Sequence, residues 1–275
     1  YRSMSENTTG EFNTAHGALA LDSNTTGSFN TAGGVGSLYR NNSGSFNTGY
    51  GAHSLSNQIT GSYNTVIGAL AMSSGDTNQH NTAIGYEALY FNKANFLTAT
   101  GSGALRRNTS GEENTAHGYQ ALHNNTSGDF NTATGHQALF TNLGGYNTAY
   151  GASALRNSVE TYNNTAIGAQ ALMSNTIGER NTALGSQALR SLTTAWGSTA
   201  VGSFALQLNT TGDRNSAFGE EALKNNSLGS WNSAFGAQTM SSNTTGDHNS
   251  AFGTGAMQFN TTGIYNVAIG SETLR

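Results

Sequence analysis

One pattern of small, apolar and polar positions repeats along the whole chain with a period of 17 residues. The idealised unit reads NTAxGxxALxxNTTGxx, and a clear copy begins at Asn13-Thr-Ala-His-Gly17. We number the positions of the repeat from this Asn. Sixteen copies occur, and of the fifteen steps between them thirteen are 17 residues long and two are 16. A fixed period over an entire chain indicates a repeat architecture.

A few positions of the repeat hardly vary. Position five is Gly in all sixteen copies, position nine is always Leu or Met, and position one is Asn in fourteen copies. We predict that each of these positions forms a structural column, with one residue from every coil. The columns begin with Gly17, Gly34, Gly51, Gly68 and Gly85, with Leu21, Leu38 and Leu55, and with Asn13, Asn30 and Asn47.

The length of the unit selects the fold class. Two-helix repeats need about 33 residues or more and leucine-rich repeats about 20 to 29. A 17-residue unit suits one coil of a solenoid, with two or three short strands that pair with the neighbouring coils. We therefore predict an all-β fold, a β-solenoid (parallel β-roll) of sixteen stacked coils. It would form one continuous array over residues 1–275 that starts and ends in mid-repeat, so we expect a segment of a longer protein or ends that abut another structure.

Strand alternation predicts which positions face the interior. Positions three and five, Ala and Gly, share one face, and we place them inside with the Leu/Met column. Position four varies from His16 to Phe252 and therefore faces outward. The NTTG stretch predicts a corner, and Asn78 and Asn95 replace its Gly in two coils. Because Asn also tolerates a positive φ, we expect left-handed backbone at this Gly.

An aromatic column precedes the anchor Asn in many coils and is a candidate binding stripe. Stacked one per coil, its rings would form an interrupted ladder. Such rings can simply cover a corner of the core, or they can bind a carbohydrate or another partner. Its members are Phe12, Phe29, Phe46, Tyr63, Phe96, Phe130, Tyr146, Trp231 and Tyr265.

The predicted interior is thin, and this bears on self-association. One Leu and two Ala per coil bury little apolar area, whereas the outward position four is often apolar and is richest in Phe near the C-terminus. An exposed apolar column can become an interface between copies of the chain. We therefore predict self-association, as a homotrimer or an end-to-end fibre.

Composition narrows the function classes. The chain has no Cys and no Pro, and only 9% of its residues are charged, with a net charge of −4. This balance argues against a nucleic-acid partner, which would need clustered Lys and Arg. No apolar run approaches the roughly 20 residues of a membrane span. The 12 Phe, 11 Tyr and 2 Trp argue against disorder.

Candidate chemistry is sparse, so we expect no enzyme, no cofactor and no metal. The seven His follow no ligand spacing. Asp129, Asp213 and Asp247 follow a corner Gly, which makes a calcium loop conceivable, but adjacent coils lack the Asp. No Ser-His-Asp arrangement or paired carboxylates emerge.

The motif Asn-Thr-Ala-x-Gly, and especially Asn266-Val-Ala-Ile-Gly270, resembles the repeat in the heads of trimeric autotransporter adhesins. The whole array is also similar to NTAxGxxALxxNTTG repeats in phage and bacterial tail-fibre-like proteins. The resemblance implies a trimeric parallel β-roll at a cell or virion surface, acting as a shaft or an adhesive head. The unit is longer than that of autotransporter heads, and the sequence contains no coiled-coil stalk, membrane anchor or chaperone domain.

These observations predict an extracellular structural or adhesive fibre segment, whose partners would be itself and surface glycans or a cell receptor. The main alternative is an ice-binding solenoid, because position two offers Thr or Ser in fifteen coils. A flat Thr face is needed for ice, and the neighbouring position four is rough. A glycan-cleaving tailspike would need clustered carboxylates on one face, which so few charged residues do not favour.

Overall fold

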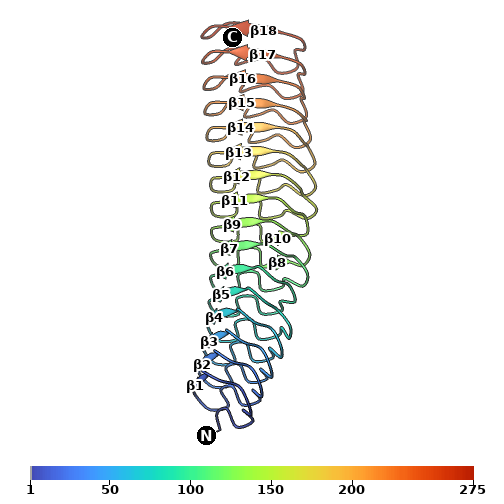
Figure 1. The fold of residues 1–275 in the computed structure, drawn as a ribbon. Helices are drawn as coiled ribbons and strands as arrows, with labels where there is room; N and C mark the ends of the chain where they lie inside the picture. The colour runs from blue at the N-terminus through green and yellow to red at the C-terminus, as the bar shows by residue number, and fades with distance from the viewer. Residues whose placement is uncertain (1) are drawn as a thin grey trace. The chain divides into compact units, whose positions relative to one another are not determined.

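The computed structural model describes residues 2–275, which form two compact units, one ending at Ala133 and the other comprising Thr134–Arg275. Each unit is a parallel β-solenoid in which one coil takes about 17 residues (Figure 1). The predicted fold class is confirmed. Every one of the sixteen repeats contributes one three-residue strand at positions two to four.

The strands of the first unit stack in chain order. They are β1 (Thr14–His16), β2 (Thr31–Gly33), β3 (Thr48–Tyr50), β4 (Thr65–Ile67), β5 (Thr82–Ile84), β6 (Thr98–Thr100), β7 (Thr115–His117) and the two-residue β8 (Asn124–Asn125). β9 (Thr132–Thr134) comprises the last two residues of the first unit and the first residue of the second. The second unit contains β10 (Thr141–Asn142), β11 (Thr148–Tyr150), β12 (Thr165–Ile167), β13 (Thr182–Leu184), β14 (Thr199–Val201), β15 (Ser216–Phe218), β16 (Ser233–Phe235), β17 (Ser250–Phe252) and β18 (Val267–Ile269).

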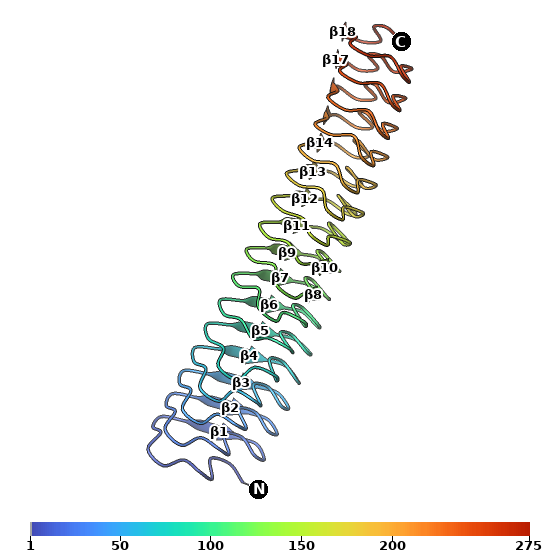
Figure 2. The ribbon, with the colours of Figure 1, turned by 90° about the vertical axis from the view of Figure 1, so that its right-hand side faces the viewer.

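Neighbouring coils are in strict register. In the first unit Thr14 pairs with Thr31 and Ala15 with Ala32, one repeat further along the chain. Across the shortened coil, Thr82 still pairs with Thr98, so the missing residue has been removed from a corner and not from the strand. Within each unit the strands therefore lie in single file, as β1–β7 and β11–β14 show in Figure 2. Like residues form columns.

Most coils contain one strand where two or three were expected, because left-handed residues interrupt the extended backbone; two coils add a short second strand, β8 and β10. All residues at position nine have φ between 46° and 54°, and those at positions seven and seventeen are also left-handed. The backbone of these turns still pairs from coil to coil, as from Leu38 N–H to Ser54 O (2.9 Å) and from Gly51 N–H to Gly33 O (2.7 Å). Hydrogen bonding between coils thus extends well beyond the strands.

The interior consists of Ala, Leu or Met, and two columns of Asn. Ala83 and Leu89 are fully buried, as are their counterparts in most coils. Asn47, at position one, donates from its amide to Gly61 O of the same coil (2.8 Å), and its backbone N–H donates to Asn30 Oδ1 of the coil before (3.0 Å). Each such Asn therefore closes its own coil and joins it to a neighbour.

A second buried Asn column, at position twelve, repeats this arrangement. The amide of Asn41 donates to Gly44 O (2.9 Å) and to Asn24 Oδ1 of the preceding coil (2.7 Å). A buried amide left without partners costs free energy, so these ladders specify the stacking register. The polar interior compensates for the small apolar content of the coil.

Two expectations about Gly were wrong. The position-five Gly does not lie inside with Ala, because Gly68 is half-buried at a corner with φ +140°. A Cβ there would come within 2.4 Å of Gly85 O, so only Gly lets the next coil approach. The NTTG Gly has no positive φ, and neither do Asn78 and Asn95. It is required for space alone, since a Cβ on Gly27 would lie 2.2 Å from Gly44 O.

Candidate functional site

The aromatic stripe forms a continuous ladder over six coils of the first unit, and Glu113 at the same repeat position then interrupts it. Five of the predicted stripe residues take part, and His80 fills the place between Tyr63 and Phe96. Successive ring centroids are 4.8 to 5.2 Å apart and the planes differ by at most 17°. The ladder runs through Phe12, Phe29, Phe46, Tyr63, His80 and Phe96.

Stacking decides which part of each ring can meet a partner. Phe46 is 47% exposed and Tyr63 is 51% exposed, so the column stands on the outside of its corner. Their faces cover one another, and what reaches solvent is the ring edge, where the partial charge is positive. A sugar that stacks on an aromatic ring needs a ring face. The ladder therefore offers a narrow apolar ridge in place of a row of sugar platforms.

The same column is interrupted in the second unit. Asn163, Arg180 and Gly197 occupy the aromatic position there, and Arg214 follows them. The Arg214 guanidinium lies between two indoles, 4.8 Å from the ring of Trp196 and 4.5 Å from that of Trp231.

A short ladder then continues from Trp231 through His248 to Tyr265, with centroids 6.0 and 4.9 Å apart. The two remaining stripe residues, Phe130 and Tyr146, occupy the same left-handed position and are 43% and 59% exposed. The predicted stripe residues thus share one position of the repeat.

Position four forms a second apolar column, which is continuous in the second unit. The rings of Phe218, Phe235 and Phe252 stack with centroids 4.8 and 4.9 Å apart. The column faces solvent: Phe218 is 37% exposed, Leu184 44% and Tyr150 60%. It comprises one residue from each of eight consecutive coils: Tyr150, Ile167, Leu184, Val201, Phe218, Phe235, Phe252 and Ile269. We call this row the apolar sheet column.

The Thr column at position two lies on the same outward face of the sheet. Thr165 pairs in register with Thr182, and Thr182 with Thr199, so the hydroxyl-bearing residues recur once per coil. Side chains two residues apart on a strand point to the same side. In β11–β17 each Thr or Ser therefore has an apolar neighbour in the same strand, as Ser233 has Phe235, and the unequal sizes of these neighbours make the face uneven.

The three Asp that follow a corner Gly accept backbone hydrogen bonds. Asp213 Oδ1 accepts from Trp196 N–H (2.9 Å), and Asp247 Oδ1 accepts from Ser230 N–H (2.6 Å). Asp129 does the same for Glu112 N–H (2.8 Å). In other coils a Ser supplies this acceptor, as Ser45 does for Ser28 N–H (3.0 Å). These carboxylates have a structural task in joining coils.

A groove of about 290 Å³ opens on the first unit where the repeat loses a side chain. Position seven carries Glu87 in one coil and Gln120 two coils later, but Gly103 between them. Tyr86 and Tyr119, at position six, also line the groove. Sequence reasoning missed this site. The signal was present as a Gly at a position that usually carries a long side chain.

An ion pair forms one wall of the groove. Arg106 Nε donates to Glu87 Oε2 at 2.5 Å, and its guanidinium also lies 5.3 Å from the ring centroid of Tyr90. The hydrogen bond from Arg106 holds the pKa of the Glu87 carboxyl below its usual value. A hydrogen bond to the Glu87 carboxylate raises the pKa of Tyr86. Burial lowers the pKa of His123 at the other side of the groove.

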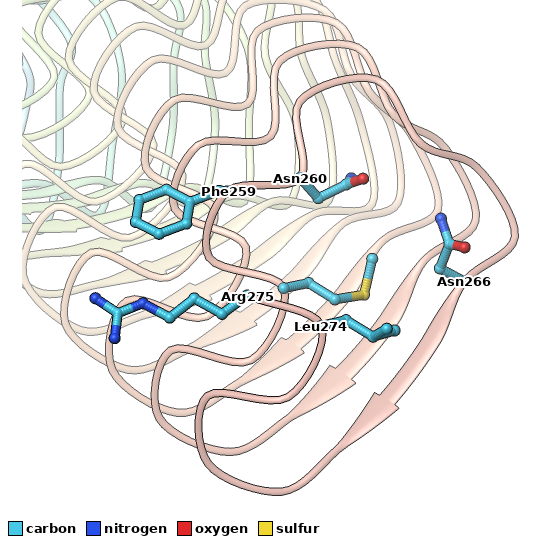
Figure 3. Close-up of a pocket in the computed structure, with 6 residues that line it drawn as sticks. Phe259, Asn260, Asn266, Leu274 and Arg275 are labelled. Atoms are coloured by element: carbon cyan, nitrogen blue, oxygen red, sulfur yellow. The ribbon is translucent and has the colours of Figure 1, made fainter.

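A further hollow of about 290 Å³ lies at the last coil of the second unit (Figure 3). Figure 3 shows Asn260 and Asn266 on separate stretches of backbone, with Leu274 below them. These residues continue the interior columns, and Leu274 is 65% exposed where other members of its column are buried. The Arg275 guanidinium lies 5.4 Å from the ring of Phe259. The hollow exposes interior positions of the repeat.

Within residues 2–275 no three His, Cys, Asp or Glu side chains are grouped so that they could hold a metal ion. No helix in this range has the length and apolar character to span a membrane. No protein-family model matches the sequence, and no curated protein matches it significantly.

Proposed function

We propose that this chain is a structural and adhesive fibre segment that assembles with copies of itself through the apolar sheet column. The observation that carries this proposal is the continuity of the column, in which eight consecutive coils each expose an apolar side chain on a parallel sheet. Exposed apolar rows of this extent are a feature of interaction surfaces.

The spacing of the column supports a second copy of the chain as its partner. Phe218, Phe235 and Phe252 recur at 4.8 to 4.9 Å, the spacing of stacked strands. A surface that is to interdigitate with this row over many coils needs the same spacing. A second copy of this chain has it, because both rows are set by the same coil. Three copies around a threefold axis would enclose three such columns in one shared interior.

A repetitive solenoid of this kind suits an extracellular, cell-surface or virion-surface role. Its coils are joined by backbone hydrogen bonds and by Asn ladders, which resist unravelling under load. The aromatic ridge of the first unit is exposed in the single chain, and we propose that it contacts a surface partner.

Molar mass in solution tests the assembly. By light scattering after size exclusion we expect three times the 28.5 kDa chain mass. Phe235→Ser, in the middle of the column, should shift the protein toward single chains. The control is Phe259→Ser, which removes an exposed Phe of the same unit outside the column and should leave the mass unchanged. A wild-type mass of one chain at micromolar concentration contradicts the proposal.

The regular Thr column favours ice binding as the second candidate function, since its hydroxyls recur once per coil. The adjacent apolar side chains make that face uneven, so we expect no thermal hysteresis from the purified protein. A clear freezing-point depression at micromolar protein would replace the adhesive proposal with the ice-binding one.

A further inference from the structure

Two Tyr in the first unit stand on either side of a gap in their column. Position six carries Tyr86, Ser102 and Tyr119 in three consecutive coils. The coils are in register here, because Gly103 N–H donates to Tyr86 O (2.9 Å) and Gln120 N–H donates to Ser102 O (3.0 Å). Tyr86 is 53% exposed and Tyr119 is 49% exposed. The small Ser between them leaves the place of one ring empty.

The size of the gap follows from the coil spacing. Adjacent rings in the aromatic ladder of the same unit are 4.8 to 5.2 Å apart. Tyr86 and Tyr119 are two coil spacings apart, with one coil between them, so their positions are separated by about 10 Å. A ring placed midway would lie about 5 Å from each Tyr, inside the range of favourable stacking.

Gly103 gives the gap its depth. A Cβ at this residue would meet only side chains, His123 Cδ2 at 3.3 Å and Gln120 Cγ at 3.5 Å. The missing side chain opens the groove of about 290 Å³ behind the two Tyr. This volume is at the lower end of the range for ligand sites and suits one small ring.

The polar groups that line the groove suit a ligand with hydroxyls and no net charge. Glu87 is neutralised by Arg106, whose Nε lies 2.5 Å from its Oε2. Burial lowers the pKa of His123, which keeps its imidazole neutral near pH 7. The Ser102 hydroxyl and the Gln120 amide also line the groove, and both types of group donate and accept hydrogen bonds.

We propose that the groove between Tyr86 and Tyr119 binds one pyranose ring of a neutral sugar. The aliphatic C–H groups of the pyranose would face the two Tyr, whose ring faces carry negative partial charge. Its hydroxyls would meet Glu87, Ser102 and Gln120. This assignment rests on the proposed adhesive role and names a ligand class for it.

The test uses the full chain and four probes, the methyl glycosides of glucose, galactose, mannose and N-acetylglucosamine. Saturation-transfer NMR detects binding, and titration of the Tyr ring signals gives the dissociation constant. We expect at least one probe to bind, and Gly103→Gln to weaken it at least tenfold by filling the groove. Gln fits the backbone here, because Gln120 adopts φ 54° at the same repeat position and Gly103 has φ 66°.

Gly255→Gln is the matched control, because Gly255 occupies the same repeat position in the second unit, with φ 65° and no atom closer than 3.7 Å to an added Cβ. It should bind the probe like the wild type. Tyr119→Ala should weaken binding at least tenfold without filling the groove. If no probe binds the wild type, or if Gly103→Gln binds equally well, the groove assignment is wrong. Because molar mass is measured separately, that result leaves the assembly proposal standing.

Discussion

The two units have the same kind of interior but expose different columns. The first unit carries six stacked rings at position seventeen, from Phe12 to Phe96, and a mixed position four that includes His16 and Gly33. The second unit interrupts position seventeen with Asn163 and Arg180 but has apolar residues at position four in eight consecutive coils. Similar coils thus present an aromatic ridge in one unit and an apolar sheet face in the other.

The difference shows which positions the coil geometry fixes. Two kinds of position are constrained by the neighbouring coils: a Cβ on a position-five Gly at the corner meets the next coil, and each inner Asn bonds to two coils. Outer positions touch mainly the same position in adjacent coils. They can therefore change in groups, and each unit acquires its own surface. If this is correct, substitutions at these constrained positions cost the same in both units.

The largest effect is expected from Gly219→Ala. A Cβ at Gly219 would lie 2.5 Å from the backbone of Gly236, at φ +139°, so the two coils must separate. We expect a loss of about 3 kcal/mol or more in the free energy of unfolding, measured by denaturant titration. Gly68→Ala should cost the same in the first unit.

Gly197→Ala is the control for that prediction. An added Cβ at Gly197 would meet only Arg214 Cγ at 3.4 Å, and non-Gly residues adopt the same left-handed conformation at this repeat position in other coils. Its cost should be the left-handed penalty alone, about 1 to 2 kcal/mol, and clearly smaller than that of Gly219→Ala. Equal losses for Gly219→Ala and Gly197→Ala would show that contact between coils is not the reason for Gly at position five.

The next largest effect concerns the Asn ladder. Asn30→Ala removes the donor to Gly44 O (2.8 Å) and the acceptor for Asn47 N–H (3.0 Å). Asn232→Ala removes the equivalent bonds to Gly246 O (2.7 Å) and Asn249 N–H (3.0 Å). Each leaves a buried backbone N–H without this acceptor, while the Gly carbonyl keeps the bond from Asn41 or Asn243, so we expect a loss of about 2 kcal/mol in both units. Hydrogen exchange should report it in the neighbouring coils, and a loss confined to one unit contradicts the shared interior.

Phe46→Asn should have a smaller effect, because two terms oppose each other. Phe46 stacks on Phe29 (4.9 Å) and on Tyr63 (5.1 Å), and these contacts are lost. Asn, however, tolerates the left-handed backbone at φ 58° better than Phe does. We expect a net loss of about 1 kcal/mol in thermal unfolding. A stabilised variant would show that the ladder contributes less than the backbone strain costs.

The smallest effect is expected from the ion pairs on the corner. The pKa of Glu87 is lowered by Arg106 in the first unit, and that of Glu221 by Lys224 in the second. A lowered pKa in the folded chain stabilises the fold at neutral pH, and this contribution is lost as acid protonates the carboxylate. Glu87→Gln should cost about 0.5 kcal/mol at pH 7, and this cost should disappear as the pH falls through the lowered pKa of Glu87.

Glu221→Gln should behave like Glu87→Gln, because both pairs join a carboxylate to a cation on the same corner of the coil. Unfolding curves of the two variants and the wild type, measured at several pH values, test this expectation. A penalty that grows as the pH falls would have the opposite sign and would rule out these ion pairs as its source.

The sequence predicted the coil, its register and its columns, because each depends on residues repeated many times. It did not predict the left-handed positions, since Leu21 and Phe12 are residues that normally avoid positive φ. It also predicted the wrong backbone conformation for the NTTG Gly, because a Gly needed for space and a Gly needed for a positive φ cannot be told apart in a sequence. Asn95 was interpreted as a replacement for this Gly. Its side chain in fact accepts a hydrogen bond from Gln79 N–H (2.8 Å), as a Ser or Asp side chain does in other coils.

The groove escaped sequence reasoning because it depends on a break in the pattern. Gly103 looks unremarkable among 36 Gly residues, and Tyr86 and Tyr119 lie 33 positions apart. Only the stacking places them two coils from each other, with Ser102 between. Repeats reveal what is common to all coils, whereas a site belongs to one of them.

The left-handed residues have a consequence for how the chain folds. Every coil contains such residues at positions seven, nine and seventeen, and each non-Gly residue in this conformation costs about 1 kcal/mol or more. The hydrogen bonds that offset this cost are made with the next coil, so an isolated coil is not stable. Folding should start from a nucleus of several coils that form together and should then propagate along the chain one coil at a time. Because each new contact spans only about one repeat, that advance requires short loops to close and can be fast.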